Sequence, residues 1–230
     1  MIRALSLDFG ETLTTLDADL LVEKLARRGV QATAVSLERA LPAAWQIYQT
    51  PAASAGHHPW KPFMTRLLEL AGCSFGAALV EDLFEDQQRQ NLWRRPLPGM
   101  IELVRDAHAA GVPVAVVSNS EGFLLELVAE LGWTDDLPIV FDSGKLGVAK
   151  PEPEIFRLAA ERLGVALTDL VHVGDSLRAD VHGALGAGAR PIWFTCPPSW
   201  PTPPTDPPAG VTVCSSAAEL RAALGLASRT

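Results

Sequence analysis

Cysteine is scarce in this chain of 230 residues, which contains only Cys73, Cys196 and Cys214. The three are odd in number, far apart and in no spacing that is typical of metal ligands. The sequence therefore predicts neither a disulfide framework nor a structural zinc site. We interpret the cysteines as small apolar side chains of a protein in a reducing compartment.

Long apolar runs and excess positive charge are also missing. The first apolar stretch ends at Asp8, too early for a signal peptide, and no run approaches the ~18 residues of a membrane span. With 19 basic and 27 acidic side chains, the net charge is −8, which opposes attraction to phosphate backbones. We expect a soluble, cytoplasmic protein that binds neither nucleic acid nor membranes. Its oligomeric state, monomer or homodimer, stays open.

Apolar residues make up 48% of the chain, and five short apolar runs predict buried strands. They alternate with segments whose apolar residues lie three and four apart, which is typical of helices. The strands are expected at 2–7, 112–117, 138–141, 170–173 and 191–195, and the helices at 98–110, 121–131, 153–163 and 178–187. A glycine follows each helix, where a left-handed residue commonly ends it: Gly111, Gly132, Gly164 and Gly188. This alternation predicts an α/β fold with a doubly wound, Rossmann-like parallel sheet.

Residues 14–95 interrupt the alternation, because they contain helical patterns but no convincing strand. Helices are expected at 19–28, 37–48, 62–70 and 77–92. We predict a helical-bundle cap domain at 14–95, inserted into a core of residues 1–13 and 96–230. Seven prolines at 196–210 predict a surface loop, with a ligand for a proline-binding module as the alternative. A short edge strand (211–213) and a capped helix (216–224) are expected to follow.

Polar residues follow three of the predicted strands. Asp8 ends the first run, Ser118 and Asn119 end the second, and Asp175 follows the fourth. Ligands of open parallel sheets bind at the carboxyl ends of the strands, and these three strands are expected to be neighbours. Two carboxylates in one crevice would repel each other without a cation, and hard oxygen ligands suit Mg²⁺. Each residue alone fits a helix cap or a turn, but their joint arrangement indicates a site.

Two further residues belong to this predicted site. Asp180 lies within the helix after Asp175, so it could orient Asp175 or a metal-bound water without binding the metal itself. Lys150 lies between a glycine-containing turn and a Pro-x-Pro helix start. Its ammonium could reach the same crevice and balance the charge of a phosphate group. An ordinary solvated lysine is the alternative.

Four segments resemble the four motifs of the haloacid dehalogenase superfamily. They are LSLDFGETL at 5–13, VVSN at 116–119, KPEPEIF at 150–156, and HVGDS at 172–176 with Asp180. The resemblance extends from Asp8 to about Trp193, and the helical insertion is similar to the first cap type of the family. It implies that Asp8 is a nucleophile that forms an aspartyl-phosphate. It also implies Mg²⁺ held by Asp8, Asp175 and the backbone carbonyl of Gly10.

The same resemblance implies further contacts with a small phosphorylated substrate. Ser118 and Lys150 would stabilise the phosphoryl group as catalytic residues. Thr12, which closes the loop of the first motif, and Asn119 would also contact the substrate. Asp180 would act behind the metal ligands. The expected function is a magnesium-dependent phosphohydrolase for a small metabolite.

Gly10 departs from the family pattern, because phosphatases of the family have a second aspartate there that protonates the leaving group. Candidates for a replacement acid are Glu11 and the cap histidines His57 and His58. One alternative function is a carbon–halogen hydrolase, since a halide leaves without a proton. Such enzymes, however, typically have an uncharged residue at the position that Asp175 occupies here. The other is a non-catalytic metal-binding module. Four cap aromatics either stack on a ligand or form the cap core: Trp45, Tyr48, Trp60 and Phe63.

Overall fold

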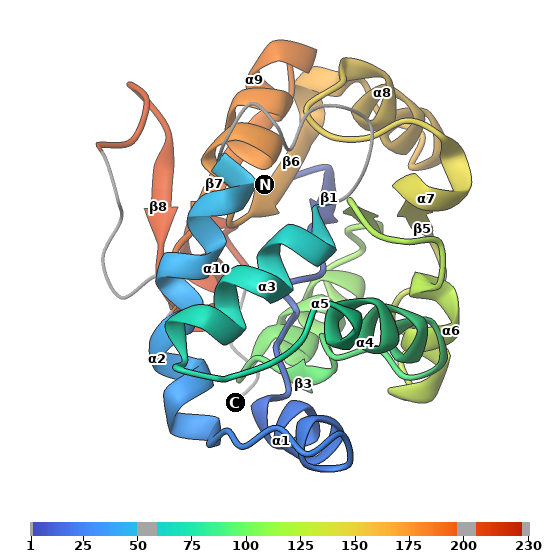
Figure 1. Ribbon diagram of the computed structural model, residues 1–230. Helices are drawn as coiled ribbons and strands as arrows, with labels where there is room; N and C mark the ends of the chain where they lie inside the picture. Colours follow the sequence, from blue (N-terminus) through green and yellow to red (C-terminus); the bar gives the residue numbers. More distant parts are fainter. Residues whose placement is uncertain (1, 50–58, 197–205, 227–230) are drawn as a thin grey trace.

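A six-stranded parallel sheet lies at the centre of the core in the computed structural model, which describes residues 2–49, 59–196 and 206–226 (Figure 1). The strand order is β5-β4-β1-β6-β7-β8. In chain order, the strands are β1 (Ala4–Leu7), β4 (Val114–Ser118), β5 (Val140–Asp142), β6 (Leu170–Gly174), β7 (Arg190–Phe194) and β8 (Thr212–Cys214). Leu7 pairs with Val116 of β4 and with Val173 of β6. The predicted central neighbours β4, β1 and β6 therefore end side by side.

Helices cover both faces of this sheet, as the alternating pattern predicts. Leu5 and Leu7 pack against α5 (Met100–Ala109), α6 (Leu124–Glu130) and α10 (Ala217–Ala223) in one apolar cluster. Ala4, on the opposite face, packs in a second cluster with α8 (Pro153–Arg162) and α9 (Gly183–Ala187). Successive strand residues point to opposite faces, so each face receives half of the apolar side chains. The doubly wound α/β fold is confirmed. Two short helices, α7 (Ser143–Leu146) and η3 (Leu167–Asp169), lie in loops.

The core helices end where the predicted glycines lie, but the helix predicted at 178–187 does not begin as a regular α-helix. All four predicted glycines have left-handed φ angles, between 70° and 87°. The helix predicted at 178–187 begins instead as the π-helical turn η4 (Leu177–His182) and continues as α9. The carbonyl of Ser176 accepts from the amides of both Asp180 and Val181, at 2.9 and 3.2 Å. This wider turn sets the position of Asp180.

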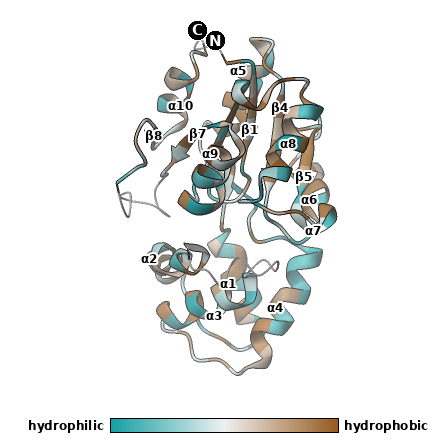
Figure 2. Cartoon of the chain, turned by 90° about the horizontal axis from the view of Figure 1, so that it is seen from above, coloured by the Kyte–Doolittle hydropathy of each residue, from teal (hydrophilic) through white to brown (hydrophobic). Residues whose placement is uncertain are grey.

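Between residues 16 and 94, the described part of the chain contains four α-helices with an apolar cluster of their own, and we call this group the cap. They are α1 (Ala18–Ala26), α2 (Ala34–Trp45) with the 3₁₀ extension η1 (Gln46–Gln49), α3 (Trp60–Leu70) and α4 (Ala78–Arg89). Figure 2 shows them grouped on one side of the sheet, beyond the ends of its strands. No helix in the described part of the chain is long and apolar enough to span a membrane.

A two-stranded antiparallel ribbon connects the cap to the core. It pairs β2 (Thr14–Thr15) with β3 (Arg95–Pro96). The amide of Leu97 donates to the carbonyl of Leu13 at 2.9 Å, and that of Asp17 donates to Leu92 at 2.7 Å. The prediction of no strand in residues 14–95 was wrong here, because two-residue strands are too short to leave an alternating pattern.

The last elements agree with the sequence. β8 adds to the sheet beside β7, and the Ser216 hydroxyl caps α10 by accepting from the amide of Glu219 at 3.2 Å. Of the proline-rich stretch, residues 197–205 lie outside the described part. The described ends of the stretch contain no helix or strand.

Candidate active site

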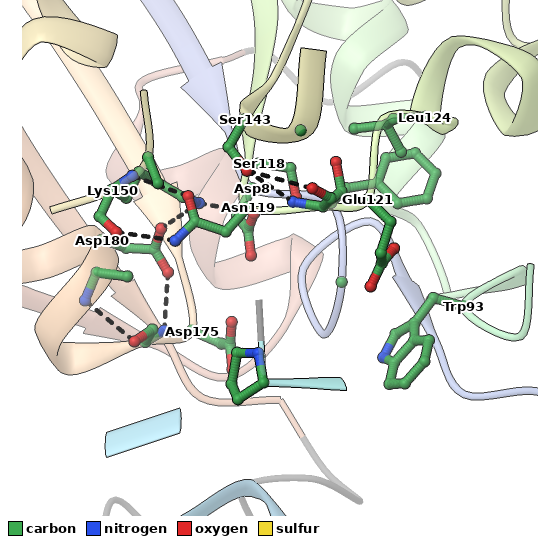
Figure 3. A pocket seen from close by; sticks show the side chains of 18 of the residues that line it. Asp8, Trp93, Ser118, Asn119, Glu121, Leu124, Ser143, Lys150, Asp175 and Asp180 are labelled. Carbon is green, nitrogen blue, oxygen red and sulfur yellow. Dashed lines mark hydrogen bonds and ion pairs between the residues drawn. The ribbon is translucent and has the colours of Figure 1, made fainter. Parts of the chain in front are cut away.

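The ends of β1, β4 and β6 bring three of the predicted site residues together. Asp8 directly follows β1, Ser118 is the last residue of β4, and Asp175 directly follows β6. Carboxylate oxygens of Asp8, Asp175 and Asp180 all lie within 4.8 Å of one another, and the three residues are buried. Figure 3 shows these side chains around one pocket. The acidic cluster is therefore built by strands that are distant in the sequence.

Lys150 lies inside this cluster. Its Nζ is 2.7 Å from Asp8 Oδ1 and 2.6 Å from Asp180 Oδ1, and its side chain is 2% exposed. Asn119 holds the lysine backbone, because its amide nitrogen donates to the Lys150 carbonyl and its oxygen accepts from the Lys150 amide, both at 2.8 Å. Asn119 also lines the pocket. The predicted substrate contact thus also positions the lysine.

Burial and ion pairing determine the charges of the cluster. Burial raises the pKa of Asp8 above its usual value, and the Asp180 carboxylate adds to this, although Lys150 and a hydrogen bond from Ser118 oppose it. Burial alone would lower the pKa of Lys150, but Asp180 and Asp8 outweigh burial and raise it. Burial alone would also raise the pKa of Asp180, yet Lys150 and His172 hold it below its usual value. We therefore assign an ammonium at Lys150 and a carboxylate at Asp180.

Asp180 receives three donors. Besides Lys150, His172 Nε2 lies 3.0 Å from Oδ1, and the amide of Ser176 donates to Oδ2 at 2.8 Å. Burial lowers the pKa of His172, so the ring is neutral. With its proton on Nε2 facing the carboxylate, Nδ1 accepts from the Ser6 hydroxyl at 2.8 Å. The ion pair between Asp180 and Lys150 is therefore held in position by two buried, neutral side chains, those of His172 and Ser6.

His172 and Ser6 were missed by the sequence reasoning. Both are polar and wholly buried in strands, where apolar residues are expected. Their paired register, Ser6 beside His172 on neighbouring strands, is decided only by the sheet. Gly174 is required beside them, because a Cβ there would lie 2.2 Å from Cγ of Asp180.

The pocket has a volume of about 620 Å³ and lies between the core and the cap. Its core wall carries the predicted residues Asp8, Gly10, Ser118, Asn119, Lys150, Asp175 and Asp180. Its cap wall is mostly aromatic and amide in character, with Trp45, Phe84, Gln87, Asn91 and Trp93. Trp60 and Phe63 lie in the cap core instead, and the Tyr48 side chain lies outside the described part of the chain. Thr12 is fully buried and does not line the pocket.

A family model for haloacid dehalogenase-like hydrolases matches residues 2–188. The chain belongs to this family. The match covers all of the strands and loops that carry the acidic cluster. The Rossmann-like core and the recognised motifs are therefore those of a haloacid dehalogenase-like hydrolase.

Individual relatives of this hydrolase are phosphatases by name. Phosphoserine phosphatase of Thermus thermophilus is 33% identical over 161 residues, which are 67% of this chain and 63% of the relative. Phosphoglycolate phosphatase of Xylella fastidiosa (strain Temecula1) is 36% identical over 95 residues, which are 41% of each chain. The chain thus spans less than two thirds of the length of these curated relatives. The crystal structure of a hydrolase of this family from Deinococcus radiodurans, with bound phosphate and sodium, superposes with a TM-score of 0.66 at 25% identity, covering 97% of this chain and 95% of that one.

The loop after Asp8 directs Glu11 away from the pocket of this hydrolase. Glu11 is 1% exposed, adopts a left-handed φ of 55° and does not line the pocket. The Thr15 hydroxyl donates to its carboxylate, at 2.9 to 3.0 Å. Gly10 does line the pocket. The other candidate acids, His57 and His58, lie outside the described residues.

Proposed function

We propose that this protein hydrolyses the phosphate ester of a small metabolite through Asp8. The observation that carries the proposal is the buried pairing of Asp8 with Lys150, beside Asp175, in a pocket that is lined by both the core and the cap. A carboxylate there suits attack on phosphorus, and an ammonium beside it balances the charge of a phosphoryl group. The names of the phosphatase relatives support this reaction class.

The donor set fits Mg²⁺. Asp8 and Asp175 supply hard carboxylate oxygens, and the Gly10 carbonyl is the third protein ligand that we propose. We propose that Asp180 does not bind the metal directly, because Lys150, His172 and the Ser176 amide already donate to its two oxygens. When bound, the metal neutralises negative charge on the transferring group.

The reaction we propose has two steps. A carboxylate oxygen of Asp8 attacks phosphorus, the ester P–O bond breaks, and the electron pair leaves with the alcohol oxygen. Water then hydrolyses the aspartyl-phosphate, releasing inorganic phosphate and restoring Asp8. Lys150 stays protonated throughout, because Asp8 and Asp180 raise its pKa. Ser118 and Asn119 face the same pocket and are the proposed phosphate contacts, together with Lys150.

One observation favours a second candidate, the hydrolysis of carbon–halogen bonds. Gly10 offers no acid, and a halide needs none when it leaves. Asp175, retained in the acidic cluster, argues instead for metal-dependent phosphate chemistry. Phosphohydrolase is therefore the first choice.

A screen of purified protein against phosphorylated metabolites and 2-haloacids, each with and without Mg²⁺, tests the proposal. We expect phosphate release that depends on Mg²⁺ and is abolished by Asp8→Asn. Halide release that does not need Mg²⁺ would establish the second candidate. Magnesium binding without turnover of any compound would favour a non-catalytic module.

A further inference from the structure

The indole of Trp93 lies beside Gly10, at the position where the sequence lacks an acid. A Cβ built on Gly10 would be 3.3 Å from Trp93 Cδ1 and 3.7 Å from Nε1. The nitrogen-bearing edge of the ring thus faces the space that a side chain at position 10 would enter. Both residues line the pocket that contains Asp8. Figure 3 shows the nitrogen edge of the ring turned toward the side of the pocket with Asp8.

The N–H group of this indole is a buried donor without a partner in the described part of the chain. The whole residue is 7% exposed, and Nε1 makes no hydrogen bond to any described residue. Most buried polar groups have a partner, so an orphan at a pocket wall points to a ligand. Trp60 Nε1 is also buried without a described partner, but Trp60 does not line the pocket. The combination of an unpaired donor and a place beside Gly10 sets Trp93 apart.

Contacts on several sides fix the Trp93 ring in place. Its centroid lies 5.5 Å from that of Phe63 and 6.0 Å from that of Trp45. Its backbone amide donates to Asn91 Oδ1 at 2.8 Å, and its carbonyl accepts from the Thr14 hydroxyl at 3.0 Å. A donor held in advance at the right position needs no rearrangement during the reaction.

We propose that Trp93 Nε1 donates a hydrogen bond to the leaving-group oxygen of the phosphate ester, in place of the missing acid. This proposal rests on the proposed phosphohydrolase function. In an in-line displacement the leaving oxygen lies opposite the nucleophile Asp8, which is the cap side of the pocket. When the P–O bond breaks, the electron pair goes to that oxygen and the indole keeps its proton. The leaving alcohol takes its proton from water.

A donor that keeps its proton stabilises a leaving oxyanion without neutralising it. The enzyme should therefore favour esters whose leaving groups are weakly basic. Removing the donor should lower the rate of hydrolysis most for those esters in which the most negative charge develops on the leaving oxygen. This makes the dependence of rate on leaving-group basicity the quantity to measure.

The first test compares Trp93→Phe with Trp60→Phe on a series of aryl and alkyl phosphates of increasing leaving-group basicity. We expect Trp93→Phe to lower kcat/KM by about 10- to 100-fold for the most basic leaving groups and less for the least basic. Trp60→Phe also removes an indole from the cap core, and its leaving-group dependence should equal that of the wild type. If the wild type is active and Trp93→Phe shows the same dependence of rate on leaving-group basicity, the proposed role of Trp93 is overturned, whereas the proposed phosphohydrolase function is not.

A second test uses the wild-type protein and needs no turnover. The indole N–H resonance of Trp93, assigned in a ¹⁵N-labelled sample, should move downfield when inorganic vanadate binds with Mg²⁺, because vanadate mimics the phosphoryl group in flight. Bound vanadate without such a shift overturns the proposal. If no phosphate ester is hydrolysed and vanadate does not bind, the proposed function fails, and the role of Trp93 fails with it.

Discussion

Gly10 adopts a backbone conformation that is open to residues with side chains, since its φ lies outside the left-handed region. Gly10→Asp is therefore expected to fold, with the Trp93 ring moving by a few tenths of an ångström to admit the new Cβ. A positioned acid contributes ~10²- to 10⁴-fold to such reactions. We expect Gly10→Asp to raise kcat for alkyl phosphates far more than for activated aryl phosphates, measured as phosphate release.

Gly10→Asn is the matched control for this prediction, because it adds nearly the same volume without an acidic proton. Asp8→Asn should abolish activity in either background. A wild type that is already fast on alkyl phosphates, and that Glu11→Gln slows, would identify Glu11 as the acid and contradict the prediction.

Asp86 is the residue whose ionisation we expect to control the stability of the cap at low pH. Arg28 donates to its Oδ2, and the buried ammonium of Lys24 lies 3.8 Å from the same atom. Burial alone would raise the pKa of Asp86, but these cations outweigh burial and lower it. A carboxyl group whose pKa is lowered by folding stabilises the folded state at pH values above its pKa in the unfolded chain, which is about 3.9. This stabilisation is lost as the pH falls through the pKa of the group in the folded protein.

Asp86→Asn should therefore lower the free energy of unfolding by about 1 to 3 kcal/mol at neutral pH, because it also leaves Lys24 buried without this partner. The difference from the wild type should shrink toward zero as the pH falls below the lowered pKa of Asp86 in the folded protein, where the wild-type carboxyl is protonated as well. Urea unfolding of both proteins at a series of pH values, from neutral downward, measures this difference. Glu81→Gln, which breaks the exposed pair with Lys61, is the control and should cost little. A difference independent of pH would show that the effect is not electrostatic.

At the scale of elements, the β2–β3 ribbon determines how the cap can move. The two connections between cap and core are paired strands, and the Thr14 hydroxyl adds a bond to the Trp93 carbonyl. Paired connections favour rotation of the cap as one body over independent bending of each.

We expect the cap to close over the pocket when vanadate and Mg²⁺ bind, which would exclude water from the phosphoryl group. Solution scattering should then report a smaller radius of gyration than for the free protein. Asp8→Asn, which removes the nucleophile, is the control. Identical scattering curves with bound vanadate would contradict a moving cap.

The main helices and the six strands of the parallel sheet were predictable from the sequence, whereas the two-residue strands β2 and β3 and the π-helical turn η4 were not. α8 begins at Pro153, as the Pro-x-Pro start predicts, and left-handed glycines follow the core helices where the pattern placed them. These signals are local, because they depend on residues within one or two turns of each other. The ribbon and the π-helical turn η4 depend on pairing partners and on the hydrogen bonds of Ser176 and Asp180, so no local pattern announces them.

In the whole molecule, the sheet brings Asp8 and Asp175, which are far apart in the sequence, into one acidic cluster, and we propose that both bind one metal ion. Calorimetric titration should show Mg²⁺ binding to the wild type and none to Asp175→Ala, because Asp8 alone would be left as a carboxylate ligand. Asp169→Asn, a change at a partly exposed residue of the same core, should bind Mg²⁺ normally. Equal binding by wild type and Asp175→Ala would remove Asp175 from the metal site.

The sequence by itself determined the α/β class, the order of the core strands in the chain and the motif residues Asp8, Ser118, Lys150 and Asp175, because periodicity and motifs lie along the chain. The tertiary structure alone decided that His172 and Ser6 support Asp180, that Asn119 holds the Lys150 backbone, and that Trp93 rather than Glu11 lies at the pocket beside Gly10. Apart from His172 and Asp180, which are eight residues apart, these contacts join residues that are distant in sequence. Packing of the cap against the core leaves no periodic trace in either segment, so only the folded chain reveals which side chains meet.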